Sequence, residues 1–288
     1  MRLLVTGAGG QLGHDVVHVA TASGDDVLAP DHGTLDVTDR DAVLGTITSW
    51  RPDVVIHSAA WTAVDACESD PGRAFAANAL AVRWVAEGCD RTGAHLVHLS
   101  TDYVFDGTLN RPYREWDRTN PQSVYGASKL AGEQEALALG PAATVVRTSW
   151  LSGEHGPNIV KTVLRLARQG SAEAGSMAFV DDQRGCPTFT ADLAPVLRRL
   201  ARDRRAGKYH VTNQGAVSWY EFVGEVVAAA GYDRAMVRPI STAELDPPRP
   251  APRPANSVLD NAVLRAAGLP LLRDFRAPLA ELVAALRR

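Results

Sequence analysis

The feature that most restricts how this chain can fold is a glycine-rich turn that directly follows a short apolar segment near its start. Residues 3–6 have the pattern of a buried strand, and residues 12–22 have that of a helix. The turn between them contains Gly7, Gly9, Gly10 and Gly13. Glycines let the backbone turn tightly and come close to a pyrophosphate, whose negative charge the N–H groups at the start of the helix would bind. A strand, this turn and a helix in that order favour a dinucleotide site over an ordinary tight connection.

The first half of the chain alternates short β-branched runs with longer helical patterns, which is typical of a parallel sheet covered by helices on both faces. The expected strands are residues 3–6, 27–29, 53–57, 95–100 and 144–148, and the expected helices are residues 12–22, 40–49, 71–91 and 121–138. Right-handed crossovers between such elements produce an open, twisted sheet. The fold class that we predict is therefore α/β, with a doubly wound parallel sheet.

The regular alternation of strand and helix patterns ends at about residue 150, which suggests a second, smaller domain. We expect residues 1–150 to form the dinucleotide-binding domain, completed by about 178–205, and residues 151–288 to form mainly a substrate-binding domain. The segment 246–256 holds five prolines, so it should be an extended arm and not a helix. The arm is either an inert strap or a substrate-side segment whose Arg249 and Arg253 meet phosphate.

Composition and charge exclude several classes of protein. With 45% hydrophobic and 22% charged residues, the 288-residue chain resembles a folded globular protein. Its net charge of -3 lacks the basic excess of a duplex-binding protein, so we expect no nucleic-acid partner. The start reaches glycine too soon for a signal peptide, and no apolar stretch is long enough to span a membrane, so we expect no membrane association. Cys67, Cys89 and Cys186 are widely spaced, which predicts free buried thiols and a cytoplasmic location.

An acidic residue after the second strand would indicate how the adenosine is bound. Asp31 lies about 20 residues beyond the glycines, where a carboxylate can bind the ribose 2′-hydroxyl of NAD(H). Asp36, followed by Val37, is an alternative beside the adenine, and Asp31 is then an ordinary loop carboxylate. Residues 27–37 contain no Lys or Arg to meet the 2′-phosphate of NADPH. The choice between NADPH and NADH stays open.

The strongest chemical signal is the pair Tyr125 and Lys129. The two residues are four apart in an expected helix, so they share one face, with about 6 Å of axial rise between their Cα atoms. A phenol whose pKa is about 10 is a poor proton donor to a ketone, but a nearby cation lowers that pKa. Lowering it to near neutrality requires about 4 kcal/mol from Lys129 and the oxidised nicotinamide together. We expect Tyr125 to donate a proton and Lys129 to tune it, against the alternative of an ordinary surface pair.

A third catalytic group should be a hydroxyl at the end of the fourth strand, where open α/β sheets bind their ligands. Ser100 and Thr101 both follow that strand. If the strand is straight as far as Ser100, Thr101 emerges into the crevice, and we predict that Thr101 bonds the substrate carbonyl. Hydroxyls also cap strand ends without any catalytic role.

Taken together, these motifs resemble those of the extended short-chain dehydrogenases/reductases, which have a Rossmann-type doubly wound sheet. Longer blocks narrow the resemblance to the dTDP-4-dehydrorhamnose reductases. The blocks are residues 54–65, 99–105, 124–133, 147–150, 182–188 and 253–257. The resemblance implies that NADPH or NADH reduces the C4 ketone of dTDP-4-dehydro-β-L-rhamnose, a dTDP-linked 4-keto sugar, to dTDP-β-L-rhamnose.

The resemblance also implies roles for individual residues. The cofactor contacts would be Gly7, Gly10, Gln11, Leu12 and Gly13 at the pyrophosphate turn, Asp31, Asp36 and Val37 at the adenosine, Ala59, Ala60, Trp61 and Thr62 on the inner side, and Leu99, Tyr125 and Lys129 by the nicotinamide. The substrate contacts would be Thr101, Asp102, Tyr125, Trp150 and Arg253, and the catalytic residues Tyr125, Lys129 and Thr101. Trp150 has the alternative of an ordinary core residue, since indoles pack cores as readily as they pack sugars.

Two departures from the family pattern limit these expectations. Ala8 stands where relatives often have Lys, which weakens the expectation of tight 2′-phosphate binding. Some relatives hold a metal at a dimer contact through acidic residues, but His14 and Asp15 form no such cluster, so we predict no metal and either a monomer or a homodimer. The rival functions are a 4-ketoreductase of an antibiotic deoxysugar or dihydrostreptose pathway and a non-catalytic regulatory subunit. A dehydratase is disfavoured because Tyr103 stands where it would have Glu.

Overall fold

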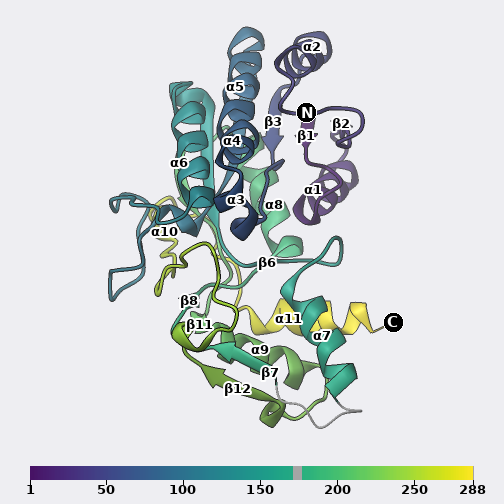
Figure 1. The fold of residues 1–288 in the computed structure, drawn as a ribbon. Coiled ribbons are helices and arrows are strands. Elements are labelled where there is room, and N and C mark those ends of the chain that lie inside the picture. Colours follow the sequence, from purple (N-terminus) through teal and green to yellow (C-terminus); the bar gives the residue numbers. More distant parts are fainter. Residues whose placement is uncertain (171–176, 288) are drawn as a thin grey trace.

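The centre of the computed structural model, which describes residues 1–170 and 177–287, is a six-stranded sheet whose strands are all parallel (Figure 1). The order across the sheet is β10-β5-β4-β3-β1-β2. The bounds are β1 Arg2–Thr6, β2 Asp26–Leu28, β3 Val54–His57, β4 His95–Thr101, β5 Ala143–Thr148 and β10 Gly207–His210. The chain moves outward from β1 to β2 and then returns past β1 to β3. The strand order therefore reverses between β1 and β3, where open α/β sheets bind ligands.

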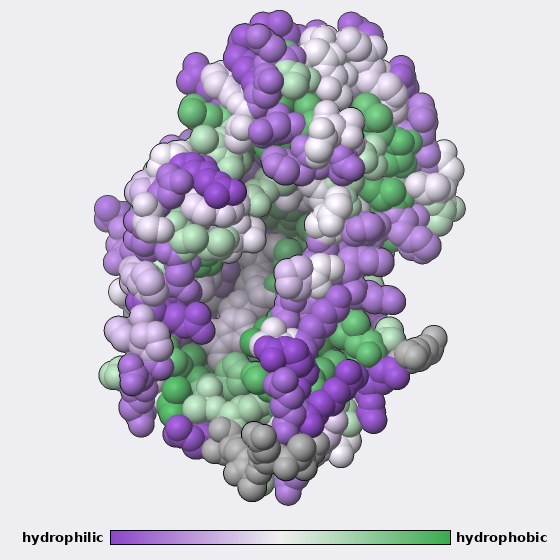
Figure 2. All heavy atoms as spheres, turned by 45° about the vertical axis from the view of Figure 1, so that its right-hand side comes forward, coloured by the Kyte–Doolittle hydropathy of each residue, from purple (hydrophilic) through white to green (hydrophobic). Residues whose placement is uncertain are grey.

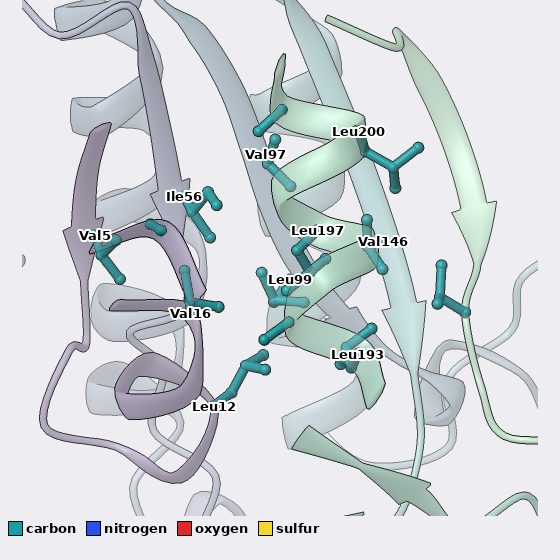
Figure 3. Packing of buried hydrophobic residues seen from close by; sticks show 14 of the residues in the cluster. Val5, Leu12, Val16, Ile56, Val97, Leu99, Val146, Leu193, Leu197 and Leu200 are labelled. Atoms are coloured by element: carbon teal, nitrogen blue, oxygen red, sulfur yellow. The ribbon is translucent and has the colours of Figure 1, made fainter. Parts of the chain in front are cut away.

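Helices cover both faces of the sheet, because its strands are apolar on both sides. Leu3 and Val5 point to the face covered by α1 and α8, and Leu4 points to the face covered by α2, α5 and α6. Figure 3 shows side chains from β1, β3, β4 and β5 meeting those of α1 and α8. The helices are α1 Gln11–Ala22, α2 Arg40–Trp50, α5 Ala81–Thr92, α6 Val124–Leu137 and α8 Thr190–Arg202. This arrangement confirms the predicted doubly wound α/β fold.

Two parts of the sheet region differ from the sequence-based expectation. The helix expected over residues 71–91 begins at Pro71 but is built from α4 Pro71–Phe75, a π-helical turn Ala76–Leu80 and α5, and a short α3 Val64–Ser69 precedes it. The sixth strand, β10, had not been predicted. It is a four-residue edge strand that contains Lys208 and His210, so it lacks the continuous apolar run by which the central strands are recognised.

The second half of the chain builds a smaller part around its own apolar cluster. The cluster includes Phe189, Phe222 and Phe275, which lie among α7, α9 and α11. The helices of this part are α7 Ile159–Gly170, α9 Trp219–Ala229 and α11 Arg276–Leu286, whereas α10 Ala262–Ala266 contacts β10 and packs Leu264 into the cluster of the sheet region. Short strands pair as β6 Leu151–Ser152 with β9 Thr188–Phe189, β7 Met177–Val180 with β12 Val237–Ile240, and β8 Arg184–Gly185 with β11 Val217–Ser218. Figure 2 shows the surface hollowed between this part and the sheet region.

Segments outside the helices also bear on the expectations. Residues 246–256 form no helix, as the prolines predicted. Cys67, Cys89 and Cys186 are free and buried, which confirms that expectation. Within residues 1–170 and 177–287, no helix has both the length and the apolar character needed to cross a membrane.

Candidate active site

The glycine-rich turn between β1 and α1 has a geometry that only glycines allow. Gly7 has a φ of 71°, and a Cβ there would lie 2.6 Å from the amide nitrogen of Ala59, which follows β3. A Cβ on Gly13 would lie 2.2 Å from the Gly7 carbonyl oxygen. The Gly10 amide donates to that same carbonyl at 2.9 Å, and α1 begins at the next residue. The first N–H groups of α1 therefore start at the point where the strand order reverses.

A cavity of about 550 Å³ opens beside this turn. Seven of the predicted cofactor residues line it, namely Gly7, Gly10, Asp36, Val37, Ala59, Ala60 and Trp61. The remaining lining residues are His32, Thr38, Ser58, Arg73, Ala76 and Ala77, which sequence reasoning missed. Arg73 is a cation at this cavity, and its guanidinium carbon lies 4.5 Å from the centroid of the Trp61 ring. A cavity of this size, bordered on one side by Gly7 and Gly10, which have no Cβ atom, fits a dinucleotide.

Asp31 lies outside the residues that line this cavity. Its exposed carboxylate accepts hydrogen bonds from the backbone and the hydroxyl of Thr34, and these bonds lower its pKa. Asp36, which does line the cavity, accepts the corresponding bonds from Thr38. Of the two alternatives for the adenosine side, the structure places Asp36 at the cavity, and the role of either carboxylate stays a prediction.

Gln11 connects the start of α1 to a distant loop. Its side-chain oxygen accepts hydrogen bonds from the Gly153 amide at 3.1 Å and from the Asn158 side chain at 2.9 Å. The Gln11 side-chain oxygen is therefore hydrogen-bonded to the loop after β6. The backbone N–H of Gln11 is the group that can bind a pyrophosphate. Leu12, Gly13 and Thr62 lie outside the cavity lining, and Leu12 belongs to the apolar core under α1.

Tyr125 lies in the first turn of α6, where the sequence placed it. The Ser123 hydroxyl accepts from the Gly126 amide at 3.1 Å and so caps this helix. Tyr125 is buried in one apolar cluster with Trp61 and Tyr103, and its ring meets that of Tyr103 edge to face at 5.7 Å. Trp61 lines the first cavity and Tyr103 lines a second one, so Tyr125, which lines neither, packs in the same cluster as one residue of each lining.

Lys129 lies one turn farther along α6 and is also buried. Its Nζ donates a hydrogen bond of 2.6 Å to the carbonyl oxygen of Leu99 on β4. Burial lowers the pKa of the Lys129 ammonium to about 8, and the Glu133 carboxylate acts in the opposite direction. Leu99, expected by the nicotinamide, is thus a direct partner of Lys129.

The expectation that Lys129 and the oxidised nicotinamide together lower the pKa of Tyr125 stays a prediction. Burial raises the pKa of the Tyr125 phenol above its usual value, and a hydrogen bond with Thr101 lowers it by less. The physical reason is that removal from water disfavours the phenolate, and the Lys129 ammonium is directed at a backbone carbonyl. A protonated phenol is nevertheless the form that a proton donor requires.

Thr101 is the last residue of β4, so the strand reaches one residue farther than predicted. Its hydroxyl donates to Asp102 Oδ1 at 3.0 Å and accepts from the Tyr103 amide at 3.2 Å. Both Thr101 and Asp102 are buried. Burial raises the pKa of Asp102 to about 6, against hydrogen bonds from Ser257 and Thr101. Tyr125, Thr101 and Asp102 therefore meet at the carboxyl end of the central strand.

The second cavity, of about 250 Å³, lies on the other side of Tyr103. Its lining includes Tyr103, Phe179, Trp219, Arg249 and Arg253. Arg253 reaches it from the proline-rich arm and forms a two-point ion pair with Asp65 of α3, at 2.6 and 2.7 Å. Hydrogen bonds from Arg253 lower the pKa of Asp65 to about 2, although burial opposes this. The arm is thus fastened to the sheet region, and both of its arginines border a cavity.

Trp150 lies just after β5 with a φ of 49°. Its ring stacks on that of Trp219 with centroids 3.6 Å apart, and it packs against the second apolar cluster. Trp219 lines the second cavity, and Trp150 is outside its lining. These contacts support the alternative that Trp150 is a core residue. A contact between Trp150 and the sugar stays a prediction.

Sequence reasoning missed two sets of residues that hold the site together. Asn78 bonds the backbone of Trp61 at both the amide and the carbonyl, at 2.8 and 3.0 Å, and donates to Ser128 of α6 at 3.0 Å. Its one signal was a polar residue inside an apolar helical run. The ion pair of Glu133 and Arg147 joins α6 to β5, and nothing in the spacing of these residues pointed to it.

Comparisons with known proteins identify the family of the chain. The chain matches the family described as RmlD substrate binding domain over residues 1–288. It is 45% identical to a dTDP-4-dehydrorhamnose reductase of Streptomyces griseus, over 97% of this chain and 92% of the relative. It is 44% identical to a probable dTDP-4,6-dihydroxy-2-methyloxan-3-one 4-ketoreductase of Streptomyces antibioticus, over 98% and 94% of the two chains.

A solved structure of a relative includes a nucleotide. The dTDP-4-dehydrorhamnose reductase of Bacillus anthracis in complex with NADP is 36% identical to this chain, covers 99% of each chain and superposes with a TM-score of 0.93. The match of the whole chain to one family and its similarity to the named reductases agree with the observed fold. The chain therefore belongs to the RmlD substrate binding domain family, in common with the dTDP-4-dehydrorhamnose reductases to which it is similar.

Proposed function

We propose that this protein is an NAD(P)H-dependent oxidoreductase that reduces the C4 ketone of dTDP-4-dehydro-β-L-rhamnose to dTDP-β-L-rhamnose. The observation that carries the proposal is that Tyr125 packs in one cluster with Trp61, which lines the cavity beside the glycine-rich turn, and with Tyr103, which lines a cavity bordered by arginines. The family and the 45% identity to a named reductase support the same reaction.

In the proposed arrangement the first cavity holds the dinucleotide and the second holds the nucleotide part of the sugar substrate. The reduced nicotinamide supplies the hydride that C4 accepts. Gln11 and Leu12 offer backbone N–H groups to the pyrophosphate, Gly10 borders it without a side chain, and Asp36 and Val37 border the adenosine. Arg253 offers a cation to the diphosphate of the sugar nucleotide, in addition to its pair with Asp65.

Proton transfer falls to Tyr125 in this proposal. The Tyr125 phenol donates its proton to the oxygen at C4 as the carbonyl becomes an alcohol. Thr101 offers its hydroxyl to the same oxygen and holds the phenol by a hydrogen bond. The Lys129 ammonium, anchored on the Leu99 carbonyl, stabilises the phenolate that remains and would bind the nicotinamide ribose.

We further propose that the dinucleotide-binding part comprises residues 1–150 together with α8 and β10, which complete the sheet region. The remaining residues would form the substrate-binding part. A monomer or a homodimer and a cytoplasmic location are proposed as well, the latter because the three cysteines are free.

The direct test is to mix the purified protein with dTDP-4-dehydro-β-L-rhamnose and to follow the loss of absorbance at 340 nm with NADPH and NADH separately. We expect turnover that yields dTDP-β-L-rhamnose. In Tyr125→Phe, turnover should fall by about 10²–10⁴-fold, because the donor proton is gone while the ring still packs. If the absorbance at 340 nm does not fall with either cofactor, although the protein measurably binds the nucleotide, the proposed reaction is refuted.

A second candidate function has an observation of its own. The similarity to the 4-ketoreductase of Streptomyces antibioticus, at 44% identity, nearly equals that to the rhamnose reductase. A different 4-keto sugar would use the same Tyr125, Lys129 and Thr101 and differ in pocket contacts worth about 1–3 kcal/mol each. The ratio of kcat/KM for the two dTDP-sugars separates these candidates.

A further inference from the structure

A buried ion pair beside the catalytic helix has no part in the mechanism described so far. Glu133 of α6 and Arg147 of β5 are each 1% exposed. Arg147 Nε donates to Glu133 Oε1 at 2.8 Å, and Arg147 Nη2 donates to Glu133 Oε2 at 2.7 Å. Burying two charges is unfavourable unless each is well bonded, and replacing such a pair with apolar residues is often neutral or stabilising. Stability alone therefore does not account for this pair.

The position of Glu133 connects it to two proposed catalytic residues. It follows Lys129 by four residues, so both side chains lie on one face of α6 and are buried together. Glu133 Oε1 also accepts a hydrogen bond of 2.5 Å from the hydroxyl of Ser100, the residue before Thr101. One carboxylate thus contacts the end of β4 and lies near the Lys129 ammonium.

The buried histidines and Tyr125 near Lys129 do not supply a negative charge at neutral pH, and Asp102, whose pKa burial raises to about 6, accepts its hydrogen bond from Thr101. His57 of β3 and His98 of β4 are buried, and burial together with the charge of Lys129 lowers the pKa of both rings. Burial raises the pKa of Tyr125, which keeps the phenol neutral. Against the desolvation that disfavours the Lys129 ammonium, Glu133 is the opposing charge.

We propose that Glu133 is a positioning residue for the reaction: its buried carboxylate, held by Arg147, keeps the Lys129 ammonium charged and, through Ser100, fixes the end of β4 that carries Thr101. This inference rests on the proposed function, since it assigns Glu133 a role through Lys129 and Thr101. The proposed role requires the negative charge of the Glu133 carboxylate and not only the shape of its side chain.

The charge of Lys129 can be measured without turnover. The chain contains three lysines, Lys129, Lys161 and Lys208, so labelling with ¹³C at the lysine ε-carbon gives three signals. The variants Lys161→Arg and Lys208→Arg assign them. We expect Glu133→Gln, which keeps an acceptor for Ser100, to move the titration midpoint of Lys129 to lower pH by about one pH unit.

The partner variants give a pattern that a purely structural role would not. Arg147→Met leaves the Glu133 carboxylate without its counter-charge, so the Lys129 midpoint should stay or rise. The double variant Glu133→Gln/Arg147→Met removes both charges and should lie between Glu133→Gln and the unaltered protein. If Glu133→Gln does not fold, the double variant alone tests the inference. We then expect its Lys129 titration midpoint to lie below that of the unaltered protein. Glu135→Gln, the same change two residues along α6, is the matched control and should leave Lys129 unchanged.

Activity provides the second readout. The alkaline limb of the kcat profile should move to lower pH in Glu133→Gln and not in Glu135→Gln, with kcat falling more than KM rises. A folded Glu133→Gln, or a folded double variant, whose Lys129 titrates as in the unaltered protein would overturn the inference. If the unaltered protein does not reduce the sugar while the Lys129 titrations shift as described, the proposed function fails and the effect of Glu133 on Lys129 stands.

Discussion

At the residue scale, the candidate cofactor site depends on glycines at positions where a Cβ atom would have no room. Gly7 and Gly13 occupy positions at which a Cβ would run into backbone atoms of the same turn or of the segment after β3. Gly9, in the same turn, is different, since a Cβ there would meet no described heavy atom within 4 Å. The three glycines therefore have separable roles, although they look alike in the sequence.

This difference gives a matched pair of variants. Gly13→Ala should weaken NADPH binding by about tenfold or more, because the new methyl group would displace the Gly7 carbonyl and widen the turn. Gly9→Ala should bind NADPH within about threefold of the unaltered protein. Calorimetric titration with NADPH measures both. Equal losses in the two variants would show that space at the turn is not what the glycines provide.

Asp102 leads to a prediction about pH. Burial raises its pKa from 3.8 to about 6, so the folded protein binds more protons than the unfolded chain between these values. The stability that this group contributes is complete below pH 4 and is lost as the pH rises through 6. The loss is on the order of 3 kcal/mol at pH 7.5.

Asp102→Asn stays neutral and should therefore avoid that loss. We expect its Tm to exceed that of the unaltered protein at pH 7.5 and the two to converge near pH 4, as measured by scanning calorimetry. Turnover of the sugar should fall, because Asp102 bonds Thr101 at the candidate site. A Tm difference that does not change between pH 4 and pH 7.5 would contradict the assignment.

At the scale of elements, the proline-rich arm brings a charged side chain to a cavity that the sheet does not otherwise reach. Arg253→Met keeps much of the apolar stem and removes the cation. We expect KM for the sugar nucleotide to rise by about tenfold or more, with kcat changed by less than about threefold, because the contact is to the diphosphate and not to the reacting carbon. Steady-state kinetics at saturating NADPH provide the measurement.

The control for Arg253→Met is Arg238→Met. Arg238 is an exposed arginine on β12, outside the lining of the second cavity. Its replacement changes the net charge equally and should leave KM unaltered. A similar rise in KM in both variants would mean that net charge, and not the arm, attracts the substrate.

The elements also show what could be predicted from the sequence and what could not. The central strands were predictable because covered parallel strands read as unbroken apolar runs, and Tyr125 and Lys129 could be paired because a spacing of four fixes a shared helix face. β10 was missed because it is a short edge strand with polar residues.

Contacts between elements were beyond reach for a different reason. Glu133 and Arg147 are 14 residues apart on a helix and a strand, and their pairing depends on how α6 packs on the sheet. The same holds for the bond from Lys129 to the Leu99 carbonyl and for the ion pair of Arg253 with Asp65. Local spacing predicts faces and ends, whereas long-range packing decides which polar groups meet.

At the scale of the whole molecule, two parts with separate apolar clusters meet along a hollow (Figure 2). The sheet region provides the glycine turn, Tyr125, Lys129 and Thr101, and the second part provides Trp219 and the arginine-bearing arm. Reduction of a sugar nucleotide needs both, since the cofactor and the substrate have to meet at one carbon. In the proposed reaction, a hydride therefore passes to C4 of the sugar beside Tyr125.

Transfer of deuterium from the cofactor to the sugar follows this hydride step. The protein is incubated with dTDP-4-dehydro-β-L-rhamnose and NADPH deuterated on both positions of nicotinamide C4, and the product is examined by mass spectrometry and proton NMR. We expect dTDP-β-L-rhamnose that carries one deuterium at C4 of the sugar, and almost none of this product from Tyr125→Phe. An unchanged sugar, or deuterium at any other carbon, would contradict the proposed reaction.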